Sequence, residues 1–64
     1  MKNRLKDLRK ANRLTQDELA KALGVTRQTI NAIENEKYNP TLELALRLAK
    51  YLNMPVEQLF ILED

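Results

Sequence analysis

The feature that most limits the folds open to this chain is its single glycine, Gly24, which lies between two segments patterned as helix. Apolar residues recur at helical spacing on both sides, at Leu19 and Leu23 before the glycine and at Ile30 after it. A turn of three residues that redirects the chain by about 90–120° needs a residue able to take a positive φ, and glycine does so without steric cost. Residues 16–35 are therefore predicted to form two short helices joined by a sharp turn.

The same helical spacing runs through almost the whole chain, and no segment alternates with the period of two that marks a strand. Several helix boundaries have chemical causes. Thr15 and Glu18 have the spacing of a capping box, while Thr26 and Thr41 are placed to cap two later helices. Pro55 suits the first turn of the last helix, where its missing N–H costs nothing. We expect a compact all-α domain of five helices and no strands, with helices at residues 2–12, 16–23, 27–35, 42–52 and from Val56 to about Phe60.

Composition excludes several classes of function. The 64 residues make one domain, residues 1–64, with no cysteine and no histidine, so disulfides, the usual zinc ligands and the commonest general base are missing. The adjacent carboxylates of Asp17 and Glu18 are explained by a helix start, and no phosphate loop is present. We therefore expect no enzyme activity, no metal and no cofactor. No apolar run or signal peptide suggests a membrane, so a soluble cytoplasmic protein is expected.

Charge is distributed unevenly along the chain. Residues 1–37 hold nine basic and five acidic residues, whereas residues 38–64 hold two basic and four acidic ones. This asymmetry has two interpretations, a basic face for an anionic partner or an uneven surface without function.

The outward side of the helix at residues 27–35 has an unusual composition. Ile30 and Ile33 lie on one side of that helix, and the first helix shows the Lys and Asp side chains that are common on a solvated face. Arg, Gln and Asn can match the hydrogen-bond patterns of base edges in the DNA major groove, and a methyl group can contact thymine. An ordinary polar face is the alternative, but the sharp turn beside it favours DNA recognition. The side opposite the isoleucines consists of Gln28, Asn31, Ala32 and Asn35, flanked by Arg27 and Thr29.

The stretch resembles the helix-turn-helix of the phage Cro and repressor family, the lambda-repressor-like or xenobiotic-response-element type of bacterial and archaeal regulators. The most specific matches are "LTQDELA", the "GVTR" turn, "INAIE" and the "YNP" loop, and the likeness extends from the first predicted helix to the fourth. The resemblance implies a lambda-repressor-like fold and a sequence-specific regulator of transcription that binds double-stranded DNA.

The resemblance also implies roles for individual residues. Base contacts are expected near the start of the recognition helix, although for Arg27 a phosphate contact is an alternative. Phosphate contacts are expected at the start of the preceding helix and in the loop after the recognition helix. The predicted base-contacting residues are Thr26, Arg27, Gln28, Asn31 and Ala32, and the predicted phosphate-contacting residues are Gln16, Asn35, Lys37, Tyr38 and Asn39.

An architectural ion pair is expected between Arg9 and Glu34, at positions where the family pairs its first and third helices. The chain departs from the family at three helix ends where glycine is common. If Glu36 keeps the family backbone, it stores strain and places a negative charge near the phosphate-contacting loop. The residues at these ends are Asn12-Arg13, Glu36 and Asn53.

The C-terminal segment "VEQLFILED", residues 56–64, combines acidic residues with four consecutive apolar ones. One recognition helix reads too few base pairs for useful specificity, so a homodimer on a pseudo-palindromic operator is expected. In the alternative, the tail folds back on its own helices. The predicted interface consists of Leu46, Phe60, Ile61 and Leu62, although Leu59 and Phe60 can also pack inside the monomer. The alternative function is an antitoxin or another protein-interaction module on the same fold, and no small-molecule effector is implied.

Overall fold

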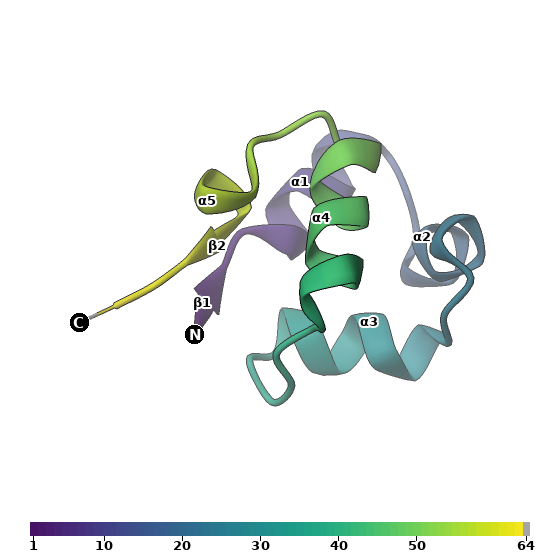
Figure 1. The fold of residues 1–64 in the computed structure, drawn as a ribbon. Coiled ribbons are helices and arrows are strands. Elements are labelled where there is room, and N and C mark those ends of the chain that lie inside the picture. The colour runs from purple at the N-terminus through teal and green to yellow at the C-terminus, as the bar shows by residue number, and fades with distance from the viewer. Residues whose placement is uncertain (64) are drawn as a thin grey trace.

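Five helices and two very short strands follow one another in the computed structural model, which describes residues 1–63 (Figure 1). In Figure 1, α4 crosses the middle of the molecule with α1 behind it, α3 runs below α4, and α2 lies on the side away from the two chain ends. The prediction of a compact five-helix domain is confirmed. The elements are β1 (Lys2–Asn3), α1 (Leu5–Ala11), α2 (Gln16–Leu23), α3 (Arg27–Glu34), α4 (Leu42–Tyr51), α5 (Val56–Leu59) and β2 (Phe60–Ile61).

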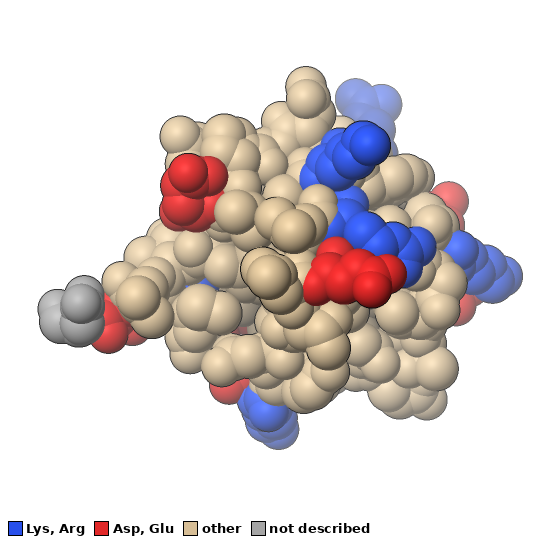
Figure 2. All heavy atoms as spheres, viewed as in Figure 1, with Lys and Arg blue, Asp and Glu red and all other residues tan. Residues whose placement is uncertain are grey.

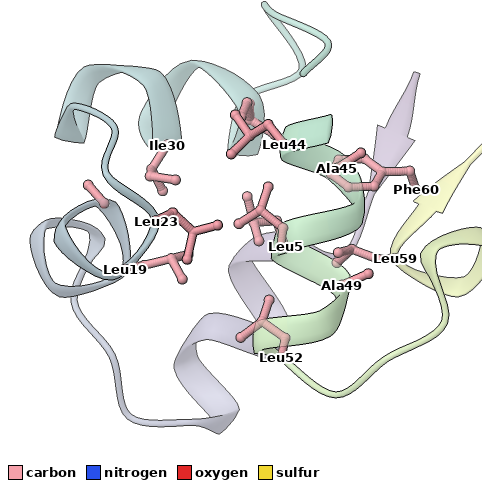
Figure 3. Close-up of a cluster of buried hydrophobic side chains, with 13 residues drawn as sticks. Leu5, Leu19, Leu23, Ile30, Leu44, Ala45, Ala49, Leu52, Leu59 and Phe60 are labelled. Carbon is pink, nitrogen blue, oxygen red and sulfur yellow. The ribbon is translucent and has the colours of Figure 1, made fainter. Parts of the chain in front are cut away.

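The core is formed by apolar side chains from all five helices and β2 (Figure 3). Ile30 and Ile33 are completely buried, so α3 is anchored by one side only. Leucine and alanine alternate along the buried side of α4, which lets neighbouring helices approach closely. Within residues 1–63, no helix combines the length and apolar character needed to cross a bilayer. The buried hydrophobic residues are Leu5, Leu19, Ala20, Leu23, Ile30, Ile33, Leu44, Ala45, Leu48, Ala49, Leu52, Leu59 and Phe60.

Three helices begin at the threonines that the sequence indicated. The hydroxyl of Thr15 accepts from the backbone N–H of Glu18 at 3.0 Å, and the Glu18 carboxylate accepts from the Thr15 N–H at 2.8 Å. This arrangement is the predicted capping box. The hydroxyls of Thr26 and Thr41 cap α3 and α4 through bonds of 3.2 Å. Pro55 differs slightly from expectation, because it precedes α5 as its N-cap instead of lying inside the first turn.

Helices α1 to α4 all end in the same way. In each, a residue with positive φ follows the last turn, and the next N–H bonds back to the carbonyl five residues earlier, as in a Schellman motif. Only one of these four residues is glycine. A Cβ added at Gly24 would meet no atom within 4 Å, so the glycine is needed for its backbone conformation and not for space. The four residues are Arg13 (φ 58°), Gly24 (71°), Glu36 (61°) and Asn53 (55°).

The expectation that the chain contains no strand was wrong. Lys2 pairs with Ile61 and Asn3 with Phe60 in an antiparallel ribbon, so α1 begins at Leu5 instead of residue 2. Strands of two residues are too short to show an alternating pattern, which is why no pattern in the sequence indicated them. The ribbon joins the two ends of the chain.

A buried ion pair connects α1 with α3. Arg9 Nε donates to Glu34 Oε2 at 2.6 Å and Nη2 donates to Oε1 at 3.2 Å, and the two side chains are 9% and 2% exposed. Arg9 Nη1 also donates to the Leu14 carbonyl at 2.8 Å, and Gln16 Nε2 donates to Glu34 Oε1 at 3.0 Å. Each member of the ion pair therefore has a further hydrogen-bond partner besides the other member.

Two substitutions at left-handed positions are expected to have opposite effects. Gly24→Ala should lower the free energy of unfolding by about 1 kcal/mol, because a Cβ is disfavoured at positive φ. Glu36→Gly should raise it by up to about 1 kcal/mol, since the extra entropy of glycine in the unfolded chain offsets part of the gain. Urea unfolding of both variants measures these changes. Changes of the same sign would contradict the backbone argument.

Replacing Arg9 is expected to be far more damaging than replacing its neighbour Lys10. Arg9→Met leaves the Glu34 carboxylate buried without its charge partner, which costs about 3–5 kcal/mol. A domain of this size has a total stability of about 3–5 kcal/mol, so the variant should be largely unfolded. Lys10→Met, at an exposed position of the same helix, is the control. Circular dichroism melting compares them, and equal midpoints would refute a structural role for the pair.

Candidate nucleic-acid interface

Helix α3 lies along one edge of the molecule, with α2 next to its N-terminal end (Figure 1). The three residues from Gly24 to Thr26 separate the two helices, so α3 does not continue α2. Its isoleucines point into the core, and the opposite side is exposed. The same edge of the molecule in Figure 2 is mostly free of charged side chains, which fits a surface of amides and hydroxyls.

Three predicted base-contacting side chains are exposed and have no hydrogen-bonding or ion-pair partner within the described residues. Arg27, Gln28 and Asn31 make no side-chain hydrogen bond or ion pair with any other residue in the range 1–63. Ala32 is half-buried beside them and adds a methyl group. One edge of α3 therefore offers a guanidinium, two amides and a small apolar contact with no structural partner.

Other predicted contact residues already have partners within the protein. The Thr26 hydroxyl caps α3 and lies 3.0 Å from the Thr29 hydroxyl. Asn35 Nδ2 donates to the Asn31 carbonyl at 2.9 Å, and the Gln16 amide donates to Glu34. For Gln16, the backbone N–H at the first position of α2 is the group that remains available for a phosphate.

The loop after α3 presents Lys37, Tyr38 and Asn39, all exposed. Lys37 occupies the position that follows the left-handed residue. At the corresponding positions after α1, α2 and α4, the chain has apolar residues packed against the core, as is usual for this motif. Only at the end of α3 is this apolar residue replaced by a solvent-exposed cation, Lys37. The three apolar counterparts are Leu14, Val25 and Met54.

The two acidic residues at this end of α3 have different environments. The Glu34 carboxylate faces Arg9 and is 2% exposed, so it presents no charge on the outward side of the helix. Glu36 is exposed in the loop beside Lys37. Within residues 1–63, no group of three acidic side chains is placed to hold a metal ion.

The predicted dimer residues do not share one environment. Phe60 is 8% exposed and packs inside the monomer, one of the two positions expected for it, because β2 turns its side chain inward opposite Asn3. Leu46, Ile61 and Leu62 are 49%, 38% and 77% exposed. The prediction omitted Leu42, which is 75% exposed one helical turn before Leu46, and this spacing of four residues could have identified it.

Comparisons with known proteins agree with this geometry. A family model described as helix-turn-helix matches residues 5–59. An uncharacterized helix-turn-helix-type transcriptional regulator of Methanocaldococcus jannaschii is 55% identical over 64 residues, which cover 100% of this chain and 97% of the relative. The helix-turn-helix-type regulator YgzD of Bacillus subtilis is 45% identical over 64 residues, which cover 100% of this chain and 97% of that relative.

A solved structure shows the same fold. The restriction-modification controller protein C.AhdI of Aeromonas hydrophila superposes with a TM-score of 0.80 at 35% identity, covering 89% of this chain and 86% of that protein. The region matched by the family model includes α2, the turn at Gly24 and α3. The chain belongs to the Cro/repressor-type helix-turn-helix family of DNA-binding transcriptional regulators.

Proposed function

We propose that this protein is a sequence-specific regulator that binds double-stranded DNA as a homodimer on a pseudo-palindromic operator. The observation that carries the proposal is the outward edge of α3, where Arg27, Gln28 and Asn31 are exposed and have no partner in residues 1–63. A helix of 8 residues held by one buried side can enter the major groove with the other.

Each side chain on this edge suits a different base feature. Arg27 can donate two hydrogen bonds to guanine, while Gln28 and Asn31 can each donate and accept at adenine. The methyl group of Ala32 can contact the thymine methyl, and Thr26 adds a hydroxyl beside them. Phosphate contacts are assigned to Gln16 at the start of α2 and to the end of α3, at Asn35, Lys37, Tyr38 and Asn39.

The homodimer is supported by exposed apolar side chains outside the proposed DNA-binding edge. Leu42 and Leu46 lie one turn apart on α4, and Ile61 and Leu62 follow the buried Phe60. Figure 2 shows a mostly uncharged surface between α4 and β2. Two-fold pairing there would place two recognition helices about 34 Å apart, one turn of DNA. In this proposal residues 1–64 form a single domain, and the interface draws on segment 56–64, of which Asp64 lies outside the described residues.

DNA binding is expected to be both selective and strongly salt-dependent. Sites should be recovered from random duplex DNA, and a dimer that neutralises about eight phosphates should give a slope of log K against log salt near −7. Asn31→Ala should lose about 1–3 kcal/mol on the selected site and little on random DNA, whereas Lys37→Ala should weaken both and reduce the slope by about 1 per protomer. Fluorescence anisotropy measures all three quantities.

Lys10→Ala serves as the matched control for Lys37→Ala, because it removes one exposed cation from α1. It should change the affinity less than Lys37→Ala at every salt concentration. Absent or salt-insensitive DNA binding by the native protein would reject the proposal and favour a protein-interaction module such as an antitoxin.

A charge placed in the apolar surface is expected to separate the dimer. Leu46→Asp and Leu62→Asp should each weaken self-association at least tenfold, because a carboxylate would be desolvated in the interface. Tyr51→Asp is the control, since Tyr51 and Leu46 are 51% and 49% exposed. Sedimentation equilibrium gives the association constants. Point variants are preferable to removal of residues 61–64, which would also remove the pairing of Ile61 with Lys2. Unchanged association in both leucine variants would place the interface elsewhere.

A further inference from the structure

The C-terminal end of α3 is tied to a residue near the start of the chain. Asn3 Nδ2 donates to the Ile33 carbonyl at 2.8 Å, across 30 residues of sequence. The other side of the same amide, Oδ1, accepts from the Leu5 N–H, the first of α1, at 3.1 Å. One half-buried side chain therefore joins the start of α1 to the last turn of the proposed recognition helix.

Asn3 is itself held in place by the terminal ribbon. Its backbone pairs with Phe60 of β2, and the next residue, Arg4, donates its N–H to the Leu59 carbonyl at 2.9 Å. Leu59 and Phe60 are 0% and 8% exposed, so the ribbon is fixed to the core. The backbone of Asn3 is thus fixed by the ribbon, while its side chain is hydrogen-bonded to α3.

The Ile33 carbonyl differs from its counterparts in the other helices. At the ends of α1, α2, α3 and α4 the left-handed residue donates its N–H to the carbonyl three residues earlier. Among the described residues, only the carbonyl of α3 also accepts a bond from a side chain, that of Asn3. This additional bond lies next to the loop of residues 35–39 that carries the proposed phosphate contacts.

We propose that Asn3 is a positioning residue for DNA recognition, which fixes the end of α3 and the loop after it relative to the terminal ribbon. The inference rests on the proposed function. The role needs a donor and an acceptor on one short side chain. Aspartate retains the acceptor for Leu5 but cannot donate to Ile33, and its carboxylate would face the Ile33 carbonyl oxygen. Asn3→Asp therefore removes the bond to α3 while keeping the bond at the start of α1.

The test compares Asn3→Asp with two control variants of the full chain. Lys2→Gln makes the same change of charge on the same strand. Met54→Ala truncates a half-buried side chain after α4 and controls for a general loss of stability. The probes are a duplex selected from random DNA and amide hydrogen exchange in the free protein, measured where all variants are folded.

Asn3→Asp is expected to weaken binding to the selected duplex about tenfold and to speed exchange of the Glu36 and Lys37 amides about tenfold, with core amides unchanged. Lys2→Gln should weaken binding less than threefold, and Met54→Ala should leave these two amides no faster than the core. A loss of affinity no larger than that of Lys2→Gln, or exchange that rises equally in the core, would overturn the proposal. Because exchange is measured without DNA, it tests the tether even if the native protein fails to bind DNA.

Discussion

Three donors converge on the carboxylate of Glu34, two from Arg9 and one from Gln16, and this contact sets the arrangement of the first three helices. Burying a charge pair is costly, and such pairs are weak contributors to net stability unless every group is satisfied. Here the third nitrogen of the guanidinium, Nη1, donates to the Leu14 carbonyl. The exit from α1, the start of α2 and the last turn of α3 therefore meet at one carboxylate, and a planar guanidinium fork tolerates little change of angle between them. The inward side of α3 is therefore fixed by polar contacts at Glu34 as well as by its buried isoleucines.

The helix ends show how a short chain makes four sharp turns with one glycine. All four turns use the same backbone motif, and three of them place a side chain at positive φ, which is disfavoured by about 1–2 kcal/mol for an ordinary residue. At Asn53 the penalty is smaller, since asparagine tolerates this region. Apolar packing of the following residue stabilises the turns after α1, α2 and α4. The turn after α3 has Glu36 and Lys37 in place of both favourable features. The geometry of this turn therefore depends more on contacts with other parts of the chain, and the hydrogen bond from Asn3 to the Ile33 carbonyl is one of them.

The helices, their capping threonines and the bend at Gly24 were predictable because each depends on neighbours within four residues in the sequence. The ribbon was not, because its two strands are 57 or more residues apart in the chain and too short to show a period. For Phe60 the sequence allowed both a core position and an interface position, and its burial is seen only together with the pairing of β2 with β1. At the candidate site, the sequence indicated which side chains lie outward on α3. It could not show that Gln16 donates to Glu34, that Arg13 rather than Asn12 takes the left-handed conformation, or that Asn3 reaches Ile33, since these follow from how the helices pack.

The outward residues of α3 are poorly explained by folding alone. Asparagine in a helix interior costs up to about 0.7 kcal/mol relative to alanine, because its amide competes with the backbone for hydrogen bonds. The Asn31 side chain has no partner among the described residues that would offset this cost, whereas Thr29, another weak helix former, bonds to the capping Thr26. A lysine or glutamate at position 31 would suit a solvated helix better. In the proposed complex, a free amide there would find a matched donor and acceptor on a base edge in the major groove.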